Sequence, residues 1–348
     1  MAVKITKPEI NVREKLSELD KPSGIAGEAM LRAETPQEQF NLIGAGRRNL
    51  LINGDFQVSQ RGDYTTAASA NVSYFVDRWY TDVASPVSVN RQHITGINIS
   101  GTPLISKGVR LVATSSGTSY TGVRQKIENP TQYVGRTFTY SGWVRSNTSN
   151  ARLTSYGNGS PNQIIVSEPH SGSGKWEKLS VTFTLYSNMV NGWFVSAFIS
   201  TAGIGSVAQV TGDYIEVTQL QLELGKVATP FEHRSYGEEL ALCQRYCQTY
   251  TGTDQEWIYI EGSQYNHKWW QIYLQTPMRA DPSVTFPSVS AAITGGAGTI
   301  TTMTSISGAS SPNRISIRCS CSANGGNPYE LRHTDGFDGQ VFIMQSEL

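Results

Sequence analysis

From Asn49 onward the chain alternates apolar and polar residues with a period of two, and this pattern constrains the fold more than any other feature. Residues 179–185 (LSVTFTL) alternate throughout, and residues 137–141 do the same. Because successive side chains of a strand point to opposite faces, such runs predict strands with one buried and one solvent-exposed face. Clusters of Gly, Asn and Ser separate the runs, as at residues 156–160 and 171–174. The pattern predicts an antiparallel β-sandwich.

One run changes its parity part-way along. Ile215 and Val217 share one parity, whereas Leu220 and Leu222 share the other. Since a shift of one residue moves every side chain to the opposite face, a strand with both halves facing the core needs an extra residue. The sequence therefore predicts a bulge or sharp twist near Thr218.

A helix interrupts the strands after residue 234. Residues 235–238 (SYGE) form a capping-box pattern, and Leu240, Cys243, Cys247 and Tyr250 follow at helical spacing. We expect a linking helix over 235–252 that carries Cys243 and Cys247 on one face. Alternation resumes in the last part, residues 253–348, for which we expect a C-terminal β-sandwich domain. There the Cys319 and Cys321 pair continues a run of isoleucines and predicts a strand.

The first 48 residues differ in composition from the rest. They hold 15 of the chain's 56 charged residues but Phe40 as their one aromatic residue. So short and polar a segment cannot close a core of its own. It predicts short helices, one near 10–19 and one capped by residues 35–38 (TPQE), forming either a docking arm or a flexible tail.

Charge and hydropathy exclude several classes of protein. The 28 basic and 28 acidic residues give no net charge, and 70 Ser and Thr residues outnumber the charged ones. A neutral chain lacks the positive field that binding to nucleic acid or to anionic membranes requires. No run of 18 apolar residues occurs, so we expect no membrane insertion.

Four ordered segments within residues 49–217 resemble the jelly rolls of carbohydrate-binding modules. They are residues 49–56 (NLLINGDF), 135–144 (GRTFTYSGWV), 175–179 (KWEKL) and 212–217 (GDYIEV). The resemblance implies a jelly roll over residues 49–234. Such jelly rolls often hold a structural calcium ion, for which Asp55 and Glu216 would be the ligands here. Gln57 departs from the glutamate that is common in the family, which weakens that expectation.

A second resemblance covers roughly residues 48–250. Residues 221–232 (QLELGKVATPFE) and 236–246 (YGEELALCQRY), with 53–56 (NGDF) and 77–79 (DRW), are similar to bacteriophage tail-fibre and related virion proteins. The resemblance implies a non-enzymatic, homotrimeric virion fibre that docks on other virion proteins through residues 1–48 and contacts a host surface glycan or protein. The expected docking residues are Arg13, Leu16, Leu19, Met30, Leu31 and Phe40.

Two alternatives remain open from the sequence. A head fibre or capsid decoration protein would need the same arm and the same stable β modules. A polysaccharide-degrading tailspike would need two carboxylates about 5–9 Å apart. The candidate carboxylates are Asp55, Asp77, Asp213 and Glu216, but the sequence places no two of them together. We therefore predict no catalytic residues and no cofactor.

Aromatic residues divide into core and contact candidates. We expect the tryptophans of the jelly-roll strands, Trp79, Trp143, Trp176 and Trp193, to lie in the core. Glycan or receptor contact is predicted for aromatic residues of the C-terminal part: Tyr259, Tyr265, Trp269 and Tyr273. Trp269 and Tyr273 share a parity opposite to Ile272, so their face is solvent, a ligand site or a subunit interface.

Overall fold

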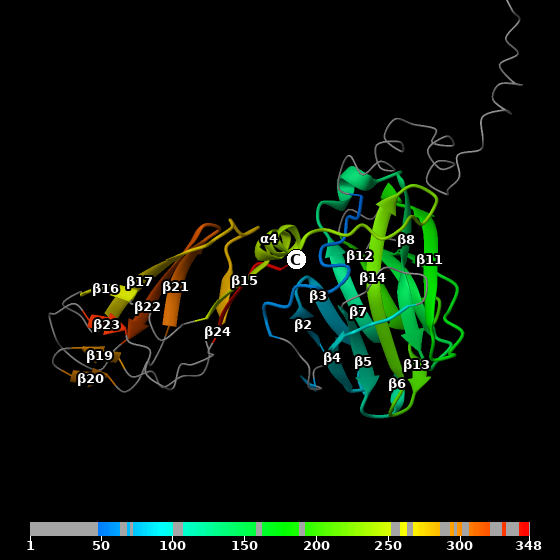
Figure 1. Ribbon diagram of the computed structural model, residues 1–348, viewed down its shortest axis with the longest axis horizontal. Helices are drawn as coiled ribbons and strands as arrows, with labels where there is room; N and C mark the ends of the chain where they lie inside the picture. Colours follow the sequence, from blue (N-terminus) through cyan, green and yellow to red (C-terminus); the bar gives the residue numbers. More distant parts are fainter. Residues whose placement is uncertain are drawn as a thin grey trace, which may run out of the picture.

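A computed structural model describes most of the chain beyond the first 47 residues. The described residues are 48–62, 68–69, 72–99, 107–157, 162–187, 192–251, 258–262, 267–285, 293–295, 298–300, 306–320, 329–331 and 341–347. The predicted arm, including all six expected docking residues, lies outside them except for Arg48. Within them the chain folds into antiparallel sheets and one α-helix (Figure 1).

Two six-stranded antiparallel sheets form the jelly roll that the sequence predicts, and Figure 1 shows them packed together. The strands of the first sheet, in spatial order, are β1 (Ala68–Ser69), β4 (Val89–Thr95), β5 (Lys107–Ala113), β14 (Tyr214–Leu224), β8 (Thr137–Ser146) and β11 (Trp176–Thr184). Those of the second sheet are β10 (Gln163–Val166), β9 (Ala151–Gly157), β12 (Trp193–Ile199), β7 (Thr121–Ile127), β3 (Trp79–Val83) and β2 (Val72–Val76). A short pair, β6 (Gly117–Ser119) and β13 (Val207–Gln209), lies beside them.

The inward faces of the two sheets share one hydrophobic core. Trp79 and Trp193 are fully buried in it, as predicted. The prediction is wrong for Trp143 and Trp176, which are half-buried and pack against a separate cluster around Ile97 on the first sheet. The alternation of β8 and β11 does not show this, because the residues that pack on this part of the outer face, Ile97 and Ile99, follow β4 in the sequence.

Strand β14 contains the predicted irregularity. Its pairing with β8 shifts register between Thr218 and Gln221, and Gln219 has a φ of 49°. The bulge lets Ile215, Val217, Leu220 and Leu222 all enter the core. The prediction of a bulge near Thr218 is therefore confirmed.

Helix α4 (Tyr236–Gln244) follows the jelly roll and is shorter than predicted. Ser235 caps it, and the predicted capping box with Glu238 is present. The expectation of a helix to residue 252 is wrong, because Cys247 begins a strand, β15 (Cys247–Thr251), which pairs with the last strand, β24 (Val341–Gln345). Cys243 and Cys247 are both buried free thiols, although they do not share one helix face.

The C-terminal part is also built of antiparallel strands. Strand β24 lies between β15 and β18 (Ser283–Thr285). A second sheet has the order β21 (Ile306–Ser311), β22 (Arg314–Ser320), β17 (His267–Tyr273), β16 (Ile258–Gly262) and β23 (Tyr329–Leu331). Strands β19 (Ile293–Gly295) and β20 (Gly298–Ile300) form a pair. Cys319 lies in β22 as predicted, whereas Cys321 lies outside the described residues.

Candidate functional site

The opening motif, residues 53–56, serves the framework of the jelly roll. The Asn53 side chain donates to the carbonyls of Val58 (2.8 Å) and Asp77 (3.0 Å) and accepts from the Val58 N–H. The Asn53 carbonyl accepts from the Trp79 indole at 2.8 Å. Gly54 lies so close to the bulge of β14 that a Cβ there would be 2.2 Å from the Leu220 oxygen. The motif thus joins the opening segment of the jelly roll, residues 48–62, to β3 and β14.

The second motif, residues 221–232 and 236–246, joins the jelly roll to α4 together with Arg234, which lies between its two stretches. Arg234 donates to the carbonyl of Leu51 (3.0 Å) and forms ion pairs with Glu232 (3.2 Å) and Glu239 (3.3 Å). Glu232 in turn accepts from the backbone N–H of Asn49 at 2.8 Å. These residues hold the chain entering the sandwich against the chain leaving it, so their role here is structural.

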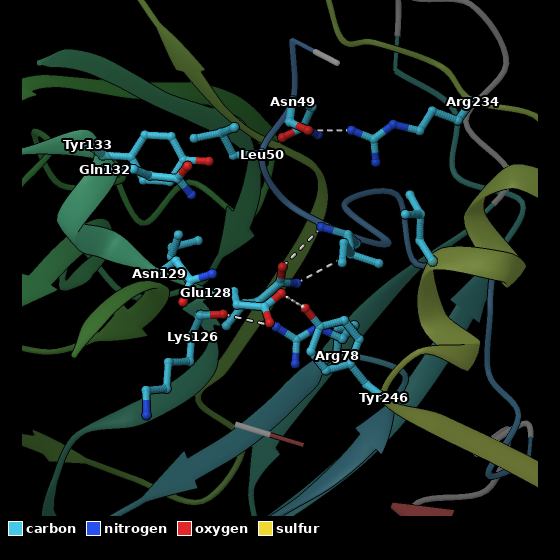
Figure 2. Close-up of a pocket in the computed structure, with 14 residues that line it drawn as sticks. Asn49, Leu50, Arg78, Lys126, Glu128, Asn129, Gln132, Tyr133, Arg234 and Tyr246 are labelled. Carbon is cyan, nitrogen blue, oxygen red and sulfur yellow. Dashed lines mark hydrogen bonds between the residues drawn. The ribbon is translucent and has the colours of Figure 1, made fainter. Parts of the chain in front are cut away.

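A pocket of about 390 Å³ lies at the same junction, between the opening segment, the end of β7 and α4. Figure 2 shows Arg78, Tyr133, Arg234 and Tyr246 among the side chains that line it. Most of these polar groups are already paired. Arg78 forms an ion pair with Glu347 at 2.6 Å, donates to the Lys126 carbonyl at 2.9 Å and stacks on the Tyr246 ring at 3.7 Å.

Other groups of the pocket are held in the same way. Gln125 exchanges two hydrogen bonds with the backbone of Ile52, at 3.0 and 2.8 Å. Tyr246 donates to Glu128 at 2.6 Å. Burial opposes the charge of Glu128, but hydrogen bonds from Tyr246 and Arg245 outweigh it and lower the pKa of this carboxyl. The pocket therefore lies at the interface between the jelly roll and the C-terminal part. Its donors and acceptors are used to stabilise that interface.

The outer face of the second sheet presents a band of aromatic and charged side chains. Val123 and Ile127 of β7 point into the core, so Arg124 and Lys126 point outward and are half-buried. Pairing across β2, β3, β7, β12 and β9 brings outward residues of five strands side by side. We call this band the aromatic–arginine face; its members are Tyr74, Tyr80, Asp82, Arg124, Lys126, Arg152, Tyr156 and Phe194.

The side chains of the aromatic–arginine face contact one another in a continuous row. The Arg124 guanidinium lies 4.8 Å from the centre of the Tyr80 ring and 5.1 Å from that of Phe194. Tyr74 contacts Tyr80 edge-on at 5.3 Å, and Tyr156 contacts Phe194 at 6.1 Å. Such contacts are each worth about 0.5–1.5 kcal/mol. They hold the rings in place at a half-exposed surface, which is what a rigid binding platform requires.

One carboxylate belongs to this face among the residues described. Asp82 pairs with Arg124 at 2.8 Å. Burial raises the pKa of the Asp82 carboxyl, and the neighbouring Arg124 opposes that rise. Burial also raises the pKa of Tyr74 to about 12. Arg124 is therefore fixed both by an ion pair and by two rings.

The two calcium candidates are not arranged as a calcium site. Glu216 is 1% exposed and lies between two guanidinium groups, those of Arg110 at 3.3 Å and Arg145 at 2.5 Å. A divalent cation there would meet two positive charges in place of further oxygen ligands. Asp55 instead accepts a hydrogen bond from Gln57. In the described ranges no group of three or more His, Cys, Asp or Glu side chains could hold a metal ion.

The structure tests little of the contact surface predicted for the C-terminal part. Tyr273, at the end of β17, is 73% exposed. Trp269 in β17 is paired with Glu261 of β16, and Tyr259 also lies in β16, but the side chains of Trp269 and Tyr259 are outside the described part, as is all of Tyr265. No helix among the described residues is long and apolar enough to span a membrane.

Comparisons with known proteins find similar structures but no similar sequence. No protein-family model and no curated protein matches the chain. A crystal structure of the enzymatically active domain of bacteriophage CBA120 tailspike protein 4 is 11% identical over 51% of this chain and 21% of that chain, with a TM-score of 0.34. The chain therefore spans well under two thirds of that tailspike protein.

Two further similar structures are carbohydrate-binding modules. The xylan-binding CBM22-2 domain of Paenibacillus barcinonensis Xyn10C is 12% identical over 45% of this chain and 99% of that one, with a TM-score of 0.32. The module TmCBM61, in complex with β-1,4-galactotriose, is 12% identical over 51% of this chain and 99% of that one, with a TM-score of 0.31. TM-scores this low do not establish a shared fold. The jelly-roll assignment therefore rests on the strand order of this chain.

The sequence gives part of the signal for the aromatic–arginine face. Arg124 and Lys126 alternate with Val123 and Ile127, which marks them as outward residues of a strand. The partners Tyr80 and Phe194 lie 44 and 70 residues from Arg124 in the sequence. Which of them meet depends on strand order and register, which local spacing does not determine.

Proposed function

We propose that this chain is a glycan-binding fibre protein of a bacteriophage particle, in which the aromatic–arginine face of the jelly roll binds the glycan. The contact row from Tyr74 through Tyr80, Arg124 and Phe194 to Tyr156 supports this proposal more than any other observation. The sequence predicted contact through the C-terminal part. Here the jelly roll is the principal binding surface. The residues predicted for the C-terminal part, among them Tyr273, make a second contact with the host.

The chemistry of the face suits a sugar. A pyranose ring presents C–H groups on its faces, which pack on the electron-rich faces of aromatic rings. Arg124, Lys126 and Asp82 supply donors and an acceptor for the hydroxyl groups at the ring edge. Because rings and guanidinium groups already contact one another, little side-chain freedom is lost on binding.

The proposal is for binding without catalysis. A glycosidase needs two carboxylates placed on either side of the scissile bond. Asp82 alone supplies a carboxylate on this face within the described residues, and Arg124 neutralises it at 2.8 Å. In the proposed virion fibre, residues 1–48 dock on other virion proteins and the chain assembles as a homotrimer.

Binding of the full-length chain to immobilised polysaccharides tests the proposal. The probes are xylan, β-1,4-galactan, dextran, alginate, hyaluronan and polygalacturonate. We expect the wild-type chain to bind at least one of them and Phe194→Ala to weaken that binding at least tenfold, about 1.4 kcal/mol. Tyr236→Ala is the matched control, since Tyr236 is 54% exposed on α4.

Two results would contradict the proposal. One is a wild-type chain that binds none of the six polysaccharides. The other is a Phe194→Ala variant that binds as tightly as wild type while keeping the wild-type melting temperature. A loss of binding in Tyr236→Ala equal to that in Phe194→Ala would count against this face as the site.

A further inference from the structure

The aromatic–arginine face carries an excess of positive charge, although the chain as a whole is neutral. Arg124, Lys126 and Arg152 lie on it together with Asp82, which leaves a net charge of +2 among the described residues of the face. The 28 basic and 28 acidic residues of the chain cancel overall. The excess is therefore a property of this surface.

Two of the three cations have no ion-pair partner within the part of the chain that the structure describes. Arg124 is paired with Asp82 at 2.8 Å, so it contributes little net charge. The Lys126 ammonium lies 5.8 Å from the centre of the Phe194 ring, and no ion pair to it occurs among the described residues. Figure 2 shows its side chain pointing away from the labelled residues of the pocket. Arg152 likewise forms no ion pair there, and its Nε has no hydrogen-bond partner.

Strand register places Lys126 beside the aromatic rings and Arg152 further along the same face. On β9, Arg152 is two residues from Thr154, and Tyr156 is two residues further along the same face. On β12, Phe194 pairs with Tyr156 on one side and with Lys126 of β7 on the other. Arg152 and Lys126 are thus two strands and four residues apart, roughly 16 Å between Cα atoms. The rings of Phe194 and Tyr156 lie in one row with Lys126, and Arg152 lies four residues from Tyr156 along β9.

We propose that the glycan bound on this face is acidic, with carboxylate groups that pair with Arg152 and Lys126 while its sugar rings pack on Tyr156 and Phe194. This inference rests on the proposed glycan-binding function. The planar fork of a guanidinium group matches a carboxylate with two parallel hydrogen bonds, and an ammonium adds a second positive charge. A neutral glycan would leave both cations unpaired beneath it, so the charge pattern fits a uronate-containing polysaccharide better.

The test compares each acidic polysaccharide with its own uncharged form. Alginate, hyaluronan and polygalacturonate are immobilised beside the same polymers after chemical reduction of their carboxylates to primary alcohols. We expect the full-length chain to bind at least one acidic polymer tenfold or more tightly than its reduced form. That preference should fall as NaCl is raised, because salt screens exposed charges.

Charge-removing variants assign the preference to residues. Arg152→Gln and Lys126→Gln should each abolish most of the preference, because each lowers the affinity for the acidic polymer far more than the affinity for its reduced form. Lys178→Gln is the matched control, because Lys178 is an exposed residue on β11 of the first sheet. It removes the same charge from the chain without touching the aromatic–arginine face, and we expect it to keep the wild-type preference.

The outcomes separate this inference from the function on which it rests. Equal affinity for acidic and reduced polymers overturns the acidic preference and leaves glycan binding standing. Binding to none of the polymers, charged or reduced, overturns both. Dextran sulfate that binds as tightly as the best uronate polymer overturns carboxylate recognition in favour of simple charge attraction. An equal loss in Lys178→Gln and Arg152→Gln assigns the effect to overall charge and also overturns the proposal.

Discussion

At the scale of single residues, Asp77 of the 77–79 motif is a buried carboxylate that connects the opening segment to β3. Its carboxylate is fully buried, accepts from the Gln60 N–H at 2.6 Å and pairs with Arg61 at 3.1 Å. Burial raises the pKa of Asp77 to about 6, although the nearby charge of Arg61 opposes that rise. Asp77 therefore connects the opening segment to β3 at an electrostatic cost that depends on pH.

We predict that Asp77→Asn changes how stability depends on pH. An unfolded aspartate has a pKa of about 4. Because the folded pKa is higher, the stability linked to this proton is fully present below about pH 4 and is lost as pH rises through about 6. Relative to Asp77→Asn, the wild-type free energy of unfolding should fall by about 3 kcal/mol between about pH 4 and pH 7. Denaturant unfolding of both proteins across this range measures the difference, and parallel profiles would contradict the prediction.

At the scale of elements, the bulge of β14 is a feature that the sequence predicts for a physical reason. Two halves of one strand with opposite parity can both face the core only if an extra residue intervenes. Gln219 takes this position with a φ of 49°, a left-handed conformation that disfavours side chains, above all branched ones. Its neighbour Leu220 then meets Gly54 of the opening segment.

We predict opposite effects of glycine and valine at the bulge and in a regular strand. Gln219→Gly should be more stable than Gln219→Val by about 2 kcal/mol, because glycine adopts the left-handed conformation without a steric penalty. At the exposed Ser180 in β11, valine should instead be favoured over glycine by up to about 1 kcal/mol. Chemical denaturation of the four variants measures both differences. The same preference at both positions would refute the assignment of strain to Gln219.

The end of α4 shows where prediction from sequence fails. Residues 235–250 keep helical spacing, and the capping box correctly marks the start of the helix at Ser235. The helix nevertheless ends at Gln244, because the backbone from Cys247 pairs with β24, almost one hundred residues later in the chain. Local periodicity contains no information about such a distant partner. The aromatic–arginine face escaped prediction for the same reason, since Tyr80, Arg124 and Phe194 meet only through strand order.

At the scale of the whole molecule, the last residues connect the C-terminal part to the jelly roll. Glu347 is nearly buried and accepts from Arg61 at 3.0 Å and from Arg78 at 2.6 Å. Next to it, the Ser346 N–H donates to the Tyr246 carbonyl at 2.8 Å. Figure 1 shows β15, β24 and α4 close together at this junction. The end of the chain therefore stabilises the contact between two parts that are distant in sequence.

We predict that Glu347→Gln loosens this junction and leaves the jelly roll intact. Removal of one partner of a buried ion pair leaves Arg61 and Arg78 undercompensated, at a cost of about 3 kcal/mol. Hydrogen exchange should become faster in peptides covering 341–347 and 247–251 and stay unchanged in β8. Arg245→Gln is the control at the same junction, because its pair with Glu128 is 46% and 29% exposed and is worth less than about 1 kcal/mol. Unchanged exchange in 341–347, or equal effects of both variants, would show that Glu347 does not hold the two parts together.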